Sequence, residues 1–68
     1  NDRVEADDII VLENGEETTL RKEAAKAKVS VEDFVRRYNE RTGNTPDEKI
    51  NDIQAEYAEE YGEPTRKR

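Results

Sequence analysis

Large apolar residues are scarce in this chain, and their spacing decides whether it can fold at all. Of its 68 residues, 44% are charged and 31% are hydrophobic, which approaches the composition of disordered proteins. The charged residues do not form blocks, however, because they interrupt the apolar residues at the spacing of amphipathic helices. We therefore expect one small, mainly α-helical domain with a modest core.

The large core candidates fall in three helical stretches and one short run near the N-terminus. They are Val4, Ile9, Ile10, Val11, Leu12, Leu20, Val29, Val31, Phe34, Val35, Tyr38, Ile50, Ile53, Tyr57 and Tyr61. The chain contains no cysteine and no histidine, so neither disulfides nor ordinary zinc ligation can reinforce this core. Stability must come from helix packing, helix caps or a partner chain.

The first part of the chain predicts a loose end and a short β-hairpin. Residues 1–7 are polar and acidic, and we expect a flexible N-terminus there. The run Ile9–Leu12 is β-branched and short, and Asn14-Gly15 is a signal for a two-residue turn. Residues 16–19 then return as a second strand. A single strand or a helical turn covering the core is the alternative.

A first helix is expected over residues 20–28, capped by Thr19 or Thr18. Its inner face holds Leu20, Ala24 and Ala27, with Ala25 beside them. These small alanines would let a neighbouring helix approach closely.

Ser30 opens the second helix, with Asp33 three residues later as an acidic variant of the capping box. Val29 and Phe34 have the spacing of a hydrophobic staple across this start. The buried stripe is Val31, Phe34, Val35 and Tyr38. Thr42-Gly43 is expected to end the helix, with Gly43 as a left-handed cap.

Thr45-Pro46-Asp47-Glu48 is the clearest local signal, with a capping Thr, Pro at the first helical position and Glu at the third. The third helix should run to Tyr61, with Ile50, Ile53, Tyr57 and Tyr61 on one stripe, and Gly62 and Pro64 should stop it. The expected domain is therefore residues 8–62, and residues 63–68 form a basic C-terminal tail.

Ala24-Ala25, a short turn and then Val29-Ser30 form the pattern on which a resemblance rests. Residues 18–50, about half of the chain, resemble the small helix-turn-helix segments common in phage and bacterial proteins. The resemblance implies that the second helix enters the major groove of duplex DNA and that the chain acts as a homodimer. It also implies a regulatory or DNA-processing protein.

The DNA-binding residues that this resemblance implies lie at the start of the second helix and on the cations around it. They are Ser30, Glu32, Asp33, Arg36, Arg37, Arg41, Lys26 and Lys28. Two features depart from the family pattern. Lys28 stands where a glycine is usual, and the acids Glu32 and Asp33 would repel phosphate, although an acid can accept from a cytosine amino group.

Charge favours an alternative reading of the same residues. Glu32–Arg36 and Asp33–Arg37 have the spacing of surface ion pairs within one helix. The net charge is −6, with acidic flanks around a mildly basic centre, whereas strong DNA-binding domains are basic. The alternative is an acidic protein-interaction module that binds a basic partner, such as a phage inhibitor or adaptor of a host protein. A structural or oligomerisation segment of a larger virion or packaging protein is a third possibility.

Other functions have little support in the sequence. No histidine or cysteine is available, the single serine is explained as a cap, and no phosphate loop or calcium-loop pattern occurs, so we expect no enzyme activity, no cofactor and no metal site. Tyr38, Tyr57 and Tyr61 continue apolar stripes, which favours packing over nucleobase stacking. No apolar run is long enough for a signal peptide or membrane span, and we expect a cytoplasmic protein.

Overall fold

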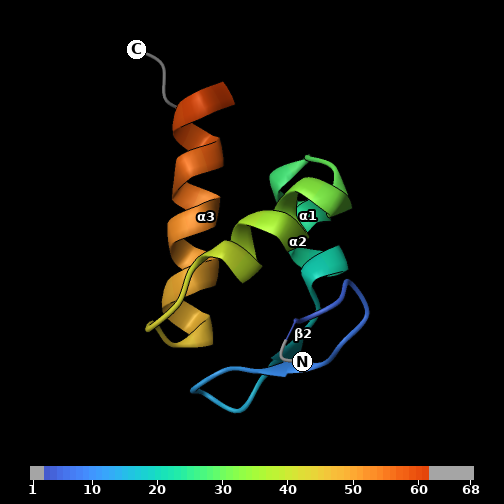
Figure 1. The fold of residues 1–68 in the computed structure, drawn as a ribbon, viewed down its shortest axis with the longest axis vertical. Coiled ribbons are helices and arrows are strands. Elements are labelled where there is room, and N and C mark those ends of the chain that lie inside the picture. The colour runs from blue at the N-terminus through green and yellow to red at the C-terminus, as the bar shows by residue number, and fades with distance from the viewer. Residues whose placement is uncertain (1–2, 62–68) are drawn as a thin grey trace.

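The computed structural model describes residues 3–61 and shows a two-stranded hairpin followed by three helices (Figure 1). The elements are β1 (Ile10–Val11), β2 (Glu17–Thr18), α1 (Leu20–Ala27), α2 (Val31–Glu40) and α3 (Pro46–Tyr61). In Figure 1, α2 lies between α1 and α3, and the hairpin lies at the end of the molecule away from the last turns of α3. The predicted mainly α fold with a preceding hairpin is confirmed.

The hairpin pairs Ile10 with Thr18 and Val11 with Glu17 in antiparallel register. Ile10 and Thr18 are both buried, whereas Val11 and Glu17 are exposed, as the alternation of side chains along a strand requires. The hairpin therefore covers the helices with one face and leaves the other face open.

The turn of the hairpin is longer than the two-residue turn predicted from Asn14-Gly15. The Leu12 N–H donates to the Glu16 carbonyl at 2.7 Å, so the loop is Glu13–Gly15, and that two-residue prediction is wrong. Gly15 has a φ of 91° and its N–H donates to the Leu12 carbonyl at 2.9 Å. The Asn14 side chain accepts the Glu16 N–H at 2.9 Å, which stabilises the extra residue.

The bend between α1 and α2 spans Lys28–Ser30. Lys28 is left-handed (φ 61°, ψ 42°), and its N–H donates to the Ala25 carbonyl at 3.2 Å. The Val29 N–H donates to the Ala24 carbonyl at 3.1 Å, which completes a Schellman motif. Lys28 thus adopts the left-handed conformation at the position of the motif where glycine is usual.

The predicted N-terminal caps are formed, with one exception in the capping box of α2. Thr19, Ser30 and Thr45 accept the N–H groups of Lys22 (3.1 Å), Asp33 (3.1 Å) and Glu48 (3.2 Å), respectively. The expected hydrogen bond from the Ser30 N–H to the Asp33 carboxylate is absent among residues 3–61, because that carboxylate accepts from Tyr57 and Arg36 instead.

The end of α2 lies earlier than predicted. The helix ends at Glu40, and Arg41 is already extended (φ −90°, ψ 133°), so the chain turns toward α3 before Thr42. Gly43 has a positive φ of 82°, but it lies in the loop and does not cap α2. The predicted helix end at Thr42-Gly43 is therefore wrong.

The core joins the hairpin to all three helices. Its buried apolar residues are Ile10, Leu20, Ala24, Phe34, Val35, Tyr38, Ile50, Ile53 and Tyr57. Three core candidates are wrong, because Ile9, Val11 and Tyr61 are 62%, 59% and 67% exposed. Ala25 is exposed as well. Tyr61 stacks on Tyr57 with ring centroids 5.9 Å apart, in the last turns of α3, which extend beyond α2 (Figure 1).

Val4 and Ala6 attach the segment of residues 3–7 to the packed unit, so this segment is not a loose end. Val4 exchanges two hydrogen bonds with the Asn39 side chain, with its N–H donating at 2.8 Å and its carbonyl accepting at 2.9 Å. The Ala6 carbonyl accepts the Arg21 N–H at 3.1 Å, and Val4 and Ala6 pack on the core. Residues 1–2 of the expected flexible N-terminus, and the expected stop and tail over residues 62–68, lie outside the described residues.

A buried carboxylate, Glu23, ties the hairpin to two helices and was not anticipated. Thr18 Oγ1 donates to Glu23 Oε2 at 2.7 Å, and Gln54 Nε2 donates to Glu23 Oε1 at 3.1 Å and to the Glu23 carbonyl at 2.9 Å. Glu23 is only 4% exposed, and its burial is tolerated because both carboxylate oxygens accept hydrogen bonds. Its position beside Leu20 and Ala24 on the inner face of α1 is a signal that the sequence does contain.

We expect Lys28→Gly to raise the free energy of unfolding by about 0.5–1 kcal/mol, because glycine adopts the left-handed conformation without the Cβ clash. Urea denaturation followed by circular dichroism measures this change. Lys28→Ala is the matched control, since it removes the charged side chain but keeps the Cβ, and it should change stability by less than about 0.5 kcal/mol. A destabilised glycine variant would contradict the assigned backbone conformation.

Candidate functional site

Four of the predicted DNA-binding residues surround one shallow hollow at the start of α2. They are Ser30, Glu32, Asp33 and Arg36. Arg36 is 58% exposed and pairs with Asp33 and, at 3.8 Å, with Glu40. The expected Glu32–Arg36 pair is wrong, because Asp33 and Glu40 take the guanidinium instead.

The two predicted lysines at the end of α1 remain accessible. Lys26 Nζ lies 3.6 Å from Glu23 Oε2, an exposed cation beside a buried carboxylate. Lys28 is exposed and has no ion pair within residues 3–61. Lys26, Lys28 and Arg36 are therefore the predicted DNA-binding cations whose side chains stay exposed.

Arg37, in contrast, lies in the interface between α2 and α3. Its Nη1 and Nη2 donate to Glu56 and Glu60, each at 3.1 Å, and its Nε lies 3.6 Å from Asp33, so the expected Asp33–Arg37 pair is confirmed. The guanidinium also lies 4.3 Å from the centroid of the Tyr57 ring. With 23% of its side chain exposed, Arg37 is a structural residue of the helix interface.

Arg41 lies in the same interface. Its Nη2 pairs with Glu56, and its Nε is buried without a hydrogen-bond partner among residues 3–61. We call this set of side chains the α2–α3 seam. It consists of Asp33, Arg37, Arg41, Glu56, Tyr57 and Glu60.

The seam shifts the proton affinities of its members. The Tyr57 hydroxyl donates to Asp33 and, with nearby Arg36 and Arg37, lowers the pKa of that carboxyl. Burial and this hydrogen bond raise the pKa of Tyr57, and the carboxylate of Glu60 raises the pKa of Arg37. Asp33, Tyr57 and Arg37 are thereby held in the protonation states that favour these contacts at neutral pH.

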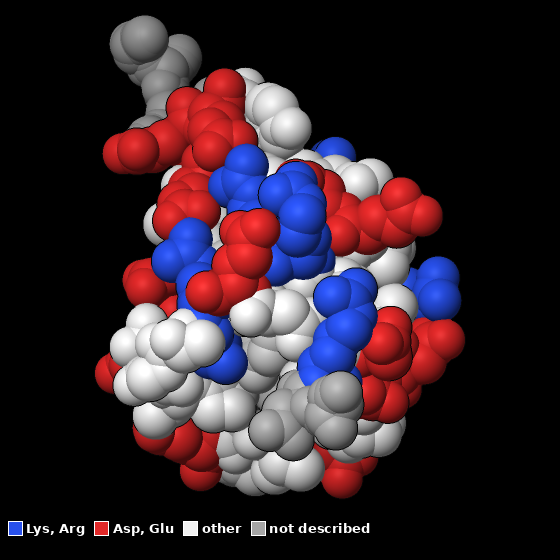
Figure 2. Space-filling model, in the orientation of Figure 1, with Lys and Arg blue, Asp and Glu red and all other residues white. Residues whose placement is uncertain are grey.

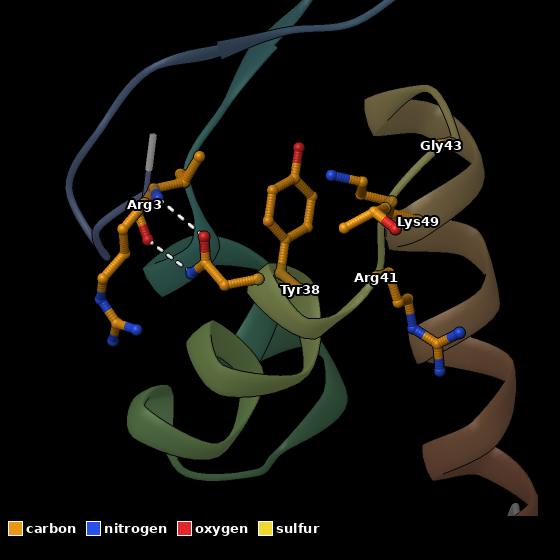
Figure 3. A pocket seen from close by; sticks show the side chains of 8 residues that line it. Arg3, Tyr38, Arg41, Gly43 and Lys49 are labelled. Carbon is orange, nitrogen blue, oxygen red and sulfur yellow. Dashed lines mark hydrogen bonds between the residues drawn. The ribbon is translucent and has the colours of Figure 1, made fainter. Parts of the chain in front are cut away.

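A second hollow lies between the N-terminal segment, the end of α2 and the start of α3 (Figure 3). Three cations line it, but they do not converge on it. Lys49 Nζ lies over the Tyr38 ring, 4.6 Å from its centroid, and the guanidinium groups of Arg3 and Arg41 point away from Tyr38 on opposite sides (Figure 3). The hollow is therefore not arranged to hold an anion.

Carboxylates without cationic partners form the most extensive charged feature. Within residues 3–61, those in no ion pair and no hydrogen bond are Glu13, Glu16, Glu17, Glu32, Glu48, Asp52 and Glu59. All are exposed. Figure 2 shows Lys and Arg side chains in the middle of one face and carboxylates on both sides of them. The acids without partners thus lie on the hairpin, on α2 and along α3.

Comparisons with known proteins give no relative: no family model, no curated protein and no solved structure matches the chain. Within the described residues, no helix has both the length and the apolar character needed to cross a membrane. Nor do residues 3–61 contain a group of three or more carboxylates placed to hold a metal ion. The function is therefore inferred from the charge and the geometry of the surface.

We expect the stability provided by Asp33 to depend on pH. Because its pKa is lowered by folding, its contribution is complete above the unfolded value of about 3.9 and is lost as pH falls through the folded value. The difference in unfolding free energy between wild type and Asp33→Asn should therefore shrink between about pH 5 and pH 2. Urea titrations at several pH values test this, and a constant difference would contradict it. Asp52, which is exposed and in no ion pair or hydrogen bond within residues 3–61, gives the control Asp52→Asn.

Arg37→Ala and Arg36→Ala separate the structural arginine from the exposed one. Arg37→Ala removes the ion pair with Glu60, one of the two pairs of Glu56 and the contact over the Tyr57 ring, so we expect a loss of about 1–2 kcal/mol in unfolding free energy. Arg36→Ala removes only exposed pairs and should cost less than about 0.5 kcal/mol. Equal losses in chemical denaturation would show that Arg37 does not hold α3.

Proposed function

We propose that this chain is a non-enzymatic protein-interaction module that presents an acidic surface to a basic partner protein. One observation carries the proposal. Arg37 and Arg41, two of the cations expected to contact DNA, are used to hold α3, whereas many exposed carboxylates have no partner within residues 3–61. What remains available to a binding partner is therefore predominantly negative.

The charge balance supports the same choice. With a net charge of −6, the chain is repelled by a polyanion, and every phosphate contact would need a cation that is free to move. A basic protein, in contrast, would be steered toward the carboxylates on the hairpin and on α3. A cytoplasmic phage inhibitor or adaptor of a host nucleic-acid-binding protein fits this chemistry, because carboxylates can occupy a site that normally binds phosphates.

DNA binding by the helix-turn-helix is the second candidate, and the bend itself favours it. A helix-turn-helix that binds DNA needs a short connection before its second helix and an exposed start of that helix, as found at Lys28–Ser30 and in α2. Lys26, Lys28 and Arg36 would make the first contacts. The carboxylates of Glu32 and Asp33 lie at the same end of α2 and oppose this binding, so a homodimer would be needed for useful affinity.

Fluorescence anisotropy with two labelled probes separates these functions. We expect a lysine-rich peptide of about 20 residues to bind at about 50 mM salt and to dissociate as salt rises, and a random duplex of about 20 base pairs to show no binding. The double variant Glu16→Gln with Glu17→Gln should weaken peptide binding. Arg36→Ala, which leaves the acids in place, is the control and should not weaken it.

DNA binding that is lost in Arg36→Ala would establish the second candidate in place of the first. Absence of binding to both probes would refute the proposed interaction with basic partners.

A further inference from the structure

Two exposed apolar side chains flank the one residue by which β1 is anchored. Ile9 and Val11 are 62% and 59% exposed, whereas Ile10 between them is buried. Large apolar residues on the outer face of a hairpin gain nothing from folding, since they remain in water. Because they are adjacent on the same face, they form a small apolar strip rather than scattered surface residues.

The main chain beside this strip is an open strand edge. In an antiparallel pair, hydrogen-bonded positions alternate, and the bond from the Leu12 N–H to the Glu16 carbonyl fixes the alternation here. The N–H and C=O of Val11 therefore point away from β2. Within residues 3–61, no other segment bonds to the main chain of Ile9 or Val11. The edge of β1 thus offers unpaired donors and acceptors.

Acids without cationic partners surround the same edge. Glu17 lies directly opposite Val11 on the exposed face, and Glu13 and Glu16 follow in the turn. None of the three has an ion pair within the described chain. An apolar strip, an open edge and a group of carboxylates therefore coincide at one place.

We propose that the open edge of β1 accepts an extended basic segment of the partner protein as a third strand. This inference rests on the proposed function, because that function makes the partner basic. The main chain of the segment would pair with the Val11 N–H and C=O, its apolar side chains would cover Ile9 and Val11, and its Lys or Arg side chains would meet Glu13, Glu16 and Glu17.

The charges decide against a second copy of this chain at the same edge. Pairing two copies through β1 would bring two sets of these carboxylates together, and like charges facing each other across strands are destabilising. Acids at an edge normally prevent such self-pairing. A basic segment removes that repulsion and gains attraction from the same groups, so the edge selects its occupant by charge.

The hairpin is held in place before any partner arrives. Thr18 bonds to buried Glu23, and the Glu13 N–H donates to Asp47 at the start of α3 at 3.0 Å. These contacts anchor β2 and the turn to α1 and α3. Because the acceptor strand is already ordered, only the incoming segment would lose conformational freedom.

Amide chemical shifts of the full chain, titrated with short peptides, test the proposal. The probe is an acetylated hexapeptide with valine at positions 1 and 3, threonine at positions 2 and 4 and lysine at positions 5 and 6, so that two valines and one lysine share a face. Its matched control carries methyl groups on every interior amide nitrogen, which removes its donors but keeps its charge. We expect shifts at Ile9–Leu12 and Glu17, and a loss of binding of about tenfold or more on methylation. Equal binding of both peptides, or shifts confined to α3, would overturn strand addition.

Variants of the chain give an independent readout. The double variant Ile9→Thr with Val11→Thr keeps β-branched residues in the strand but removes the apolar strip, and it should weaken the peptide about tenfold. Tyr61→Thr removes an equally exposed apolar residue from the end of α3 and should leave binding unchanged. Equal effects of the two changes would overturn the proposal.

Failure of this inference is distinguishable from failure of the proposed function. If the lysine-rich probe binds but its shifts lie on α3, the chain still recognises basic partners and only the strand edge is wrong. If no lysine-containing peptide binds, the proposed function itself is refuted. Sedimentation analysis completes the test, and a dimer abolished by the Ile9 and Val11 changes would assign the edge to a second copy and overturn the proposal.

Discussion

Arg37 makes more polar contacts between α2 and α3 than any other side chain of the seam. Its guanidinium lies over the Tyr57 ring and donates to Glu56 and Glu60. The Tyr57 hydroxyl in turn donates a hydrogen bond to Asp33. A chain with so small a core has few other ways to attach a long helix, because only Ile50, Ile53 and Tyr57 of α3 are buried. The seam therefore combines apolar burial with charge pairing, and it does so beside an aromatic ring that excludes part of the water.

This use of arginine changes what the surface can do. The acids of α3 neutralise Arg37 and Arg41, which are therefore not free to contact an anionic partner. The charges that stay exposed without a partner within residues 3–61 are predominantly negative. The bend at Lys28 does not by itself distinguish a DNA partner from a basic protein partner. The distribution of free charge is what distinguishes them.

The hairpin shows how local order can prepare an interaction. Burial of Ile10 and Thr18 fixes which face of β1 is inside, and the alternation of the strand then forces Ile9 and Val11 outward. The sequence pattern indicated a short strand at Ile9–Leu12, but all four residues were expected in the core. The helices cover only one face of this two-stranded hairpin, so the side chains on its other face have no layer to pack against.

The sequence by itself determined the features that are set within one turn of chain. Thr19, Ser30 and Thr45 cap helices because each hydroxyl reaches an N–H three residues ahead, and such bonds need no contact with a distant part of the chain. Only the tertiary structure decided that Tyr61 is exposed and that Arg37 faces α3. Those outcomes depend on how closely distant helices approach, and spacing along one helix does not contain that distance.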